Sequence, residues 1–103
     1  MKMSSAKENG VLLLSLEGEL DHHVARGTMQ KISNQIDVEL PHKTVIDFSG
    51  LGFMDSSGIA VVMNTYKKMR EIDGTLMIER VPKQAAKVFA AAGVNKIISI
   101  NNI

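Results

Sequence analysis

Cysteine is absent from the 103 residues of the sequence, so disulfide bonds, thiol nucleophiles and cysteine-based zinc sites are excluded. A strong excess of one charge is also missing. The 12 basic and 11 acidic residues leave a formal net charge of +1, which gives little attraction to nucleic acid or to an anionic membrane. The longest apolar runs, 59–63 and 88–92, are far shorter than the ~20 residues of a membrane span. No apolar segment follows Lys2 as in a secretory signal. These absences predict a protein of the cytoplasm that contacts neither nucleic acid nor membrane directly.

The composition that is present is typical of a folded domain. Hydrophobic residues make up 45% of the sequence and charged residues 22%, which lies within the globular range and outside the disordered one. A length of 103 residues suits one domain better than two. We therefore expect a single domain that covers residues 1–103.

Short apolar segments predict the strands of this domain. The run 11–16 is too short for a helix and is closed by a glycine at position 18. The pair Asn9-Gly10 before it is typical of a hairpin turn, so the stretch 3–8 is predicted to pair back as an edge strand. Further strands are predicted at 44–48, 75–79 and 97–100. The glycine-rich stretch 49–52 is expected to end the strand at 44–48.

Apolar residues at three- and four-residue spacing predict three helices between these strands. The first is expected to be N-capped by Asp21 and to end before Pro41. The second begins near Ser56, and the third extends from Pro82 to Gly93. The apolar stripes are formed by Ala25, Met29, Ile32, Ile36 and Leu40, by Ile59, Val62, Met63, Tyr66 and Met69, and by Ala85, Ala86, Val88, Phe89 and Ala92. This alternation predicts an α/β fold with a mixed, mostly parallel sheet, an N-terminal hairpin and about three packed helices. The periodicity leaves open whether the helices cover one face of the sheet or both.

Polar residues gather at two predicted strand-to-helix junctions, 18–23 and 53–58, and ligands and partners of α/β folds tend to bind at such junctions. In the second junction, Asp55 or Ser56 is the expected helix N-cap, and Gly58 permits tight packing of the first helical turn. These structural roles explain the segment as well as a functional role does, so its chemistry has to be tested against known motifs.

The motifs of catalysis do not fit this junction. The nucleophile elbow G-x-S-x-G around Ser56 requires a glycine where Met54 stands, and no histidine follows His42 to complete a triad. The phosphate-binding loop G-x-x-x-x-G-K-[ST] is absent as well. The adjacent His22 and His23 would point about 100° apart on a helix and could not share one metal ion. We therefore expect no enzyme, no metal site and no cofactor.

A serine at the start of a helix is instead well placed for a switch. A phosphoryl group on Ser56 would add roughly −1.5 to −2 charges at pH 7, which the helix dipole tolerates. The adjacent Asp55 and an acidic partner surface would both repel it. Such a modification would leave the fold intact and abolish an interface.

The two junctions together resemble a known family. Residues 18–23, which contain Asp21-His22-His23, and residues 53–59, which contain Asp55-Ser56-Ser57-Gly58, are similar to the signature of the anti-sigma factor antagonists with the STAS fold. The resemblance continues through Tyr66-Lys67 and 88–93, so it covers nearly the whole chain in the same order. The histidine pair is more similar to the sporulation type, which acts on the anti-sigma-F factor, than to the general-stress branch.

This resemblance implies a partner-switching regulator of transcription in bacteria. In the family, the unphosphorylated antagonist binds an anti-sigma factor that is also an ATP-dependent serine kinase, and the sigma factor is released. The kinase phosphorylates the first serine of the motif, which corresponds to Ser56, with Ser57 as the second choice. A PP2C-type phosphatase then restores the active form. The partner-binding surface of the family corresponds to Asp21, His22, Met54, Asp55, Ser57 and Gly58.

A second hypothesis keeps the STAS fold and assigns a different role. Other STAS proteins are non-catalytic subunits of larger sensory or membrane-transport assemblies, and co-purifying subunits without ATP-dependent phosphorylation would favour that role here. The sequence also departs from the antagonist pattern, because members of that family usually continue past the last strand into another helix, whereas this sequence stops at Ile103. The resemblance therefore does not specify what covers that end of the sheet.

Overall fold

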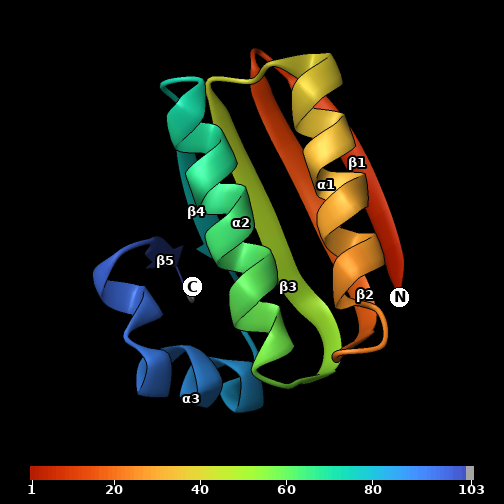
Figure 1. The fold of residues 1–103 in the computed structure, drawn as a ribbon, viewed down its shortest axis with the longest axis vertical. Helices are drawn as coiled ribbons and strands as arrows, with labels where there is room; N and C mark the ends of the chain where they lie inside the picture. Colours follow the sequence, from red (N-terminus) through yellow and green to blue (C-terminus); the bar gives the residue numbers. More distant parts are fainter. Residues whose placement is uncertain (102–103) are drawn as a thin grey trace.

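Five strands form one sheet in which the spatial order of the strands follows the chain, β1-β2-β3-β4-β5 (Figure 1). The computed structural model describes residues 1–101. The elements are β1 (Lys2–Glu8), β2 (Val11–Leu20), α1 (Ala25–Glu39), β3 (Lys43–Met54), α2 (Ser57–Glu71), β4 (Thr75–Glu79), α3 (Lys83–Ala92), the short 3₁₀ helix η1 (Val94–Lys96) and β5 (Ser99–Asn101). Only the β1–β2 pair is antiparallel, and each later pair is parallel. The predicted α/β fold, with its N-terminal hairpin and mostly parallel sheet, is confirmed.

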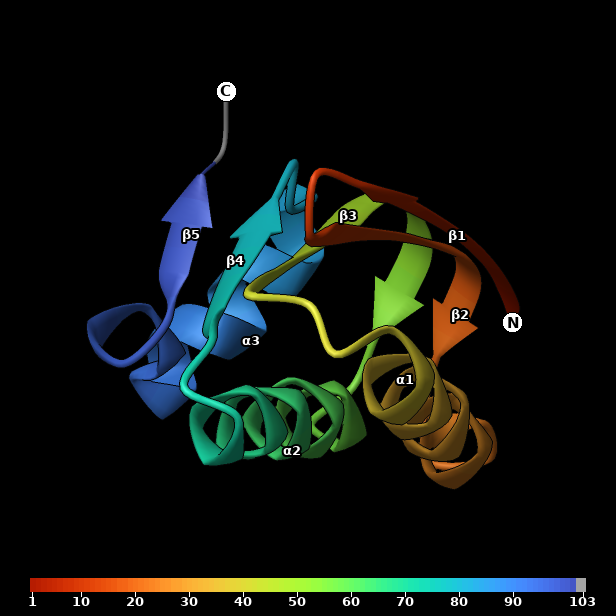
Figure 2. The ribbon, with the colours of Figure 1, turned by 90° about the horizontal axis from the view of Figure 1, so that it is seen from above.

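Helices α1 and α2 lie side by side on one face of the sheet (Figure 2). The side chains of β2 that point toward them are fully buried at alternate positions, Leu12, Leu14 and Leu16, whereas Leu13 on the other side is 39% exposed. This alternation is that of a strand with one covered face and one open face. The two helices are also joined by an ion pair between Lys68 Nζ and Asp37 Oδ1 at 2.7 Å.

Helix α3 lies at the end of the sheet toward which β2 and β3 run (Figure 1). It is held there by Phe89, whose ring centroid lies 5.6 Å from that of Phe48 in β3, and by the buried Ala85. Gly93 ends the helix with a φ of 74°, the left-handed conformation that favours glycine. Within residues 1–101, no helix has the length and apolar character needed to cross a membrane.

Several strand boundaries differ from the sequence prediction, and the first is that of β2, which continues through Gly18 to Leu20. The prediction that β3 ends at 49–52 is wrong, because the strand continues to Met54 and stays paired with β2 through two register shifts. Gly50 is required for this path, since a Cβ there would lie 2.7 Å from the Leu16 carbonyl oxygen. The last strand begins at Ser99 rather than at 97, because η1 and the half-exposed Ile97 precede it.

The apolar stripe predicted for the second helix is only partly buried. The core-facing residues of α2 are Gly58, Val61, Val62, Thr65 and Met69. Of the predicted positions, Ile59, Met63 and Tyr66 are only half-buried and lie at the edge of the core. In the first helix Leu40 is 66% exposed, so it does not belong to the buried stripe. The outer side of α2 therefore carries partly exposed apolar side chains.

Candidate functional site

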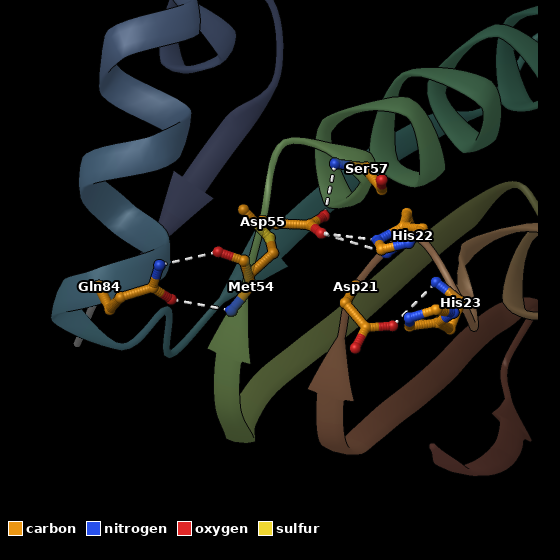
Figure 3. A network of polar contacts seen from close by, with 7 residues as sticks. All are labelled: Asp21, His22, His23, Met54, Asp55, Ser57 and Gln84. Carbon is orange, nitrogen blue, oxygen red and sulfur yellow. Dashed lines mark hydrogen bonds and ion pairs between the residues drawn. The ribbon is translucent and has the colours of Figure 1, made fainter.

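The two polar junctions identified in the sequence lie beside each other in space (Figure 3). Strands β2 and β3 are neighbours, and their last residues, Leu20 and Met54, are register partners. The amide of Asp55 continues the pairing by donating to the Leu20 carbonyl oxygen at 3.2 Å. Because the strands are parallel, both chains leave the sheet at the same edge and turn into α1 and α2 there. The segments 21–24 and 55–58 therefore form one continuous surface.

Asp55 links the two segments. Its Oδ1 accepts a hydrogen bond from the Ser57 backbone N–H at 2.8 Å, which satisfies one of the free amides at the start of α2. Its Oδ2 accepts from the His22 backbone N–H at 3.1 Å and lies 3.7 Å from His22 Nδ1. The sequence prediction of a cap at Asp55 or Ser56 thus resolves in favour of Asp55, because the Ser56 side chain makes no capping bond.

The same contacts favour the ionised form of Asp55. Desolvation by burial raises the pKa of the carboxyl, but hydrogen bonds from the Ser57 backbone and side chain lower it, as do the His22 backbone N–H and the charge of His22. The sum leaves the pKa of Asp55 below its ordinary value. The carboxylate is therefore a fixed negative charge at the start of α2 across the neutral pH range.

Asp21 organises the neighbouring segment in a similar way. Its Oδ1 accepts from the His23 backbone N–H at 3.0 Å, and its carbonyl oxygen accepts from the amides of Val24 and Ala25. The prediction that Asp21 caps the first helix directly is wrong, because α1 begins at Ala25 after this extra turn. The turn directs the side chains of His22 and His23 outward, with ring centroids 4.0 Å apart.

The two serines of the motif differ in accessibility. Ser56 is exposed and directly precedes the first residue of α2, whereas Ser57 is half-buried and bound to Asp55. A hydroxyl that a modifying enzyme must reach is better provided by the exposed residue. Among residues 1–101, the structure shows no hydrogen bond between a histidine and either serine.

Two residues expected on the partner-binding surface prove to be internal. Met54 is fully buried, and its side chain fills the space beneath Gly58, where a Cβ would overlap the Met54 Sδ. Gly58 is buried too, so it allows close packing and presents no side chain to a partner. The assignment of Met54 and Gly58 as surface contacts is therefore corrected. The neighbouring Phe53, which belongs to the predicted junction 53–58 but not to the expected contacts, is 42% exposed.

An apolar groove of about 760 Å³ lies along the outer side of α2, and its first lining residue on that helix, Ala60, is one turn after Ser56. Ala60, Met63 and Lys67 in its lining follow Ser56 by four, seven and eleven residues, so they share one face of the helix with it. Met29 of α1 borders the groove on one side. Exposed apolar surface of this kind is typical of a site of protein contact.

Metal binding finds no support in the described part of the chain, where no three His, Asp or Glu side chains come close enough to hold an ion. The histidine pair and Asp55 are close together, but they supply only an exposed hydrogen-bonding surface. The arrangement can recognise a partner and can receive a charge at Ser56.

Comparison with known proteins gives concordant matches. A family model described as STAS domain matches residues 2–103. The chain is 28% identical over 100 residues to the anti-sigma F factor antagonist of Paenibacillus polymyxa, across 97% of this chain and 86% of that protein. It is 30% identical over 83 residues to the anti-sigma F factor antagonist of Lysinibacillus sphaericus, across 81% of this chain and 71% of that protein.

Solved structures show the same fold. The anti-sigma factor antagonist SpoIIAA in its unphosphorylated form is 24% identical, with a TM-score of 0.74 over 96% of this chain and 86% of that one. The Bacillus cell fate determinant SpoIIAA in the phosphorylated form is 25% identical, with the same TM-score over 96% of this chain and 90% of that one. The resemblance inferred from segments 18–23 and 53–59 is confirmed by these matches.

Proposed function

This chain belongs to the STAS domain family, and on that premise we propose that it is an anti-sigma factor antagonist of the sporulation type in the cytoplasm of a bacterium. In its unphosphorylated form it binds an anti-sigma factor that is also a serine kinase, and the bound sigma factor is released. Phosphorylation of Ser56 with ATP ends this binding, and a PP2C-type phosphatase restores it. The protein acts by binding and is a substrate rather than an enzyme.

The observation that carries the proposal is the exposed position of Ser56 at the start of α2, near the exposed Phe53 and the apolar groove along α2. Phe53 and the groove along α2 supply the apolar area that a partner buries. His22 and the carboxylate of Asp55 supply polar contacts at its rim. Asp21 and Ser57 contribute by shaping the two turns.

The charge of a phosphoryl group explains why binding would stop. A phosphate on Ser56 adds roughly −1.5 to −2 charges beside the ionised Asp55, at a surface that binding must remove from water. A penalty of ~3 kcal/mol in binding is more than a hundredfold in affinity. The helix start itself tolerates the added charge, because the macrodipole is positive there. The switch therefore acts on the interface and leaves the fold in place.

Intact-mass spectrometry after incubation with the cognate anti-sigma factor kinase and Mg-ATP tests the proposal. We expect one added phosphate, located on Ser56 by fragmentation, and roughly a hundredfold or greater loss of kinase affinity in calorimetry of the modified protein. Ser57→Ala is the matched control and should still receive one phosphate on Ser56, whereas Ser56→Ala should bind the kinase and remain unlabelled. Equal labelling of Ser56→Ala would refute the acceptor assignment. No phosphate from an active kinase would favour the alternative role as a subunit of a larger sensory or transport assembly.

A further inference from the structure

Gln84 in α3 makes an unusual contact with the strand that leads to Ser56. Its side-chain Oε1 accepts from the Met54 backbone N–H at 2.8 Å, and its Nε2 donates to the Met54 carbonyl oxygen at 2.7 Å (Figure 3). One amide side chain therefore satisfies both backbone groups of the last residue of β3. The two residues are 30 positions apart in the sequence.

The topology of the sheet explains why Met54 needs this partner. Strand β4 pairs with β3 only from Lys43 to Asp47, so the later part of β3 has no strand on that side. In a parallel ladder, the N–H and C=O of one residue point to the same side, and successive residues alternate. The Asp55 amide points to β2, where it bonds the Leu20 carbonyl oxygen, and the backbone groups of Met54 point away from β2. Gln84 thus supplies the hydrogen bonds that a further strand would have made.

Fixing Met54 also fixes the turn that follows it. The Met54 side chain packs under Gly58, in the first turn of α2, and leaves no space for a Cβ there. The next residue, Asp55, holds the Ser57 amide and the His22 amide through its carboxylate. Ser56 lies between these two constraints and is itself exposed. The position of its hydroxyl therefore depends on the contacts of Met54 and Asp55. One of these is the contact of Met54 with Gln84 in α3.

We propose that Gln84 is a positioning residue for phosphoryl transfer to this protein, because it holds the end of β3 in the conformation that presents Ser56 to the kinase. The proposal rests on the proposed function for the identity of the reaction. The contact of Gln84 with Met54 itself does not depend on it. In this proposal α3 contributes to the phosphorylation site through the two hydrogen bonds between Gln84 and Met54.

The test uses Gln84→Met, which keeps the length of the side chain and removes both hydrogen bonds. Lys87→Met is the matched control, because it places the same side chain at an exposed position of the same helix, three residues further on. Gln84→Glu is the second variant. It can still accept from the Met54 N–H but sets a carboxylate against the Met54 carbonyl oxygen, and it keeps the test usable if the methionine variant does not fold.

The first measurement is amide hydrogen exchange in the free protein, with urea unfolding to correct for global stability. We expect the Met54 amide and the amides of 55–57 to exchange at least about tenfold faster in Gln84→Met. The acceleration should be smaller in Gln84→Glu, which keeps one acceptor, and Lys87→Met should exchange at the wild-type rate. This readout needs no kinase, so it stands even if the proposed function fails. Wild-type exchange at residues 54–57 in both Gln84 variants would overturn the proposal.

The second measurement is the steady-state rate of Ser56 phosphorylation by the cognate kinase. We expect kcat to fall roughly tenfold in Gln84→Met while KM stays within about twofold, because misplacement of a reacting group slows the transfer and leaves the docking surface on α2 unchanged. If the lower rate came only from unfolded protein, urea unfolding would show a reduced folded fraction of the variant. Unchanged kcat in a folded Gln84→Met protein would refute the positioning role. Absence of phosphorylation in the wild type would refute the proposed function instead.

Discussion

The two strand-to-helix turns of this domain begin alike and end differently. In both 21–24 and 55–58 an aspartate accepts the backbone N–H of the residue two positions later, at 3.0 Å in the first and 2.8 Å in the second. Only Asp55 also reaches across to the other turn, where it binds the His22 amide. The fourth residue differs too, because Val24 is half-buried at the surface and Gly58 is fully enclosed.

The difference shows how one local motif can serve two purposes. The turn at 21–24 is defined by its own hydrogen bonds and carries exposed side chains. The turn at 55–58 is held in addition by the His22 amide, by the packing of Met54 under Gly58 and by Gln84. We infer that the second turn is the more rigid of the two. Under the proposed function the Ser56 hydroxyl has to meet a kinase, and rigid presentation favours that reaction.

The largest effect on stability is expected from adding a side chain at Gly58, in the turn 55–58. Gly58→Val should lower the free energy of unfolding by about 1–3 kcal/mol, because its side chain must displace the buried Met54 and Leu20. Urea unfolding followed by circular dichroism measures this change. The control is Gly27→Ala in α1, where a Cβ meets nothing within 4 Å, so the helix should gain up to about 1 kcal/mol. If both variants were equally stable, the tight packing of the α2 turn would be disproved.

A second experiment removes the aspartate carboxylates of the two turns. Asp21→Ala should lower the free energy of unfolding by about 1 kcal/mol, because the His23 amide loses its carboxylate acceptor. Asp55→Ala should shift the urea midpoint further, because it leaves two backbone amides without their acceptor, one in each turn. It should also loosen residue 22, which the exchange rate of the His22 amide reports. A larger midpoint shift for Asp21→Ala would contradict the cross-linking role of Asp55.

The smallest expected effect is a loss of folding stability at acidic pH. The folded-state pKa of Asp55 is lowered, and so is that of Asp47, where desolvation by burial is outweighed by hydrogen bonds from Arg80 and Ser49. A carboxyl whose pKa is lowered by folding stabilises the fold at pH values above its ordinary pKa of 3.8. This stabilisation is lost as the pH falls through the lowered folded-state pKa. Urea midpoints from about pH 6 to about pH 2.5 should therefore decline below about pH 4. Asp55→Asn should show a shallower decline, and an identical decline would contradict the assigned ionisation.

Much of the architecture follows from local pattern. The hairpin, the three helices and the parallel sheet were predictable, because Asn9-Gly10, the apolar periodicities and the Pro82 and Gly93 boundaries each have a direct conformational meaning. The two polar junctions were predictable for the same reason. Neighbouring parallel strands bring their carboxyl ends to one edge, so segments 18–23 and 53–58 had to meet there.

The failures of prediction share another cause. Gly50 and Gly52 suggested a turn at 49–52, yet they allow β3 to pass close to β2 through register shifts that only the partner strand defines. Met54 belongs to a motif that suggested exposure, and its burial depends on Gly58 and Leu20 together. The contact of Gln84 with Met54 joins residues 30 positions apart, and no local spacing indicates it. Long-range pairing decided each of these positions.

The order of the strands has a consequence for synthesis on the ribosome. Because the spatial order follows the chain order, each new strand can join the free edge of those already made, and none has to insert between two others. The hairpin β1–β2 is made first, and each later strand can add to the same edge. The segment around Ser56 emerges before α3, so the end of β3 receives its last two hydrogen bonds only when Gln84 arrives. Under the proposed function, the competent kinase substrate is therefore the finished domain rather than the nascent chain.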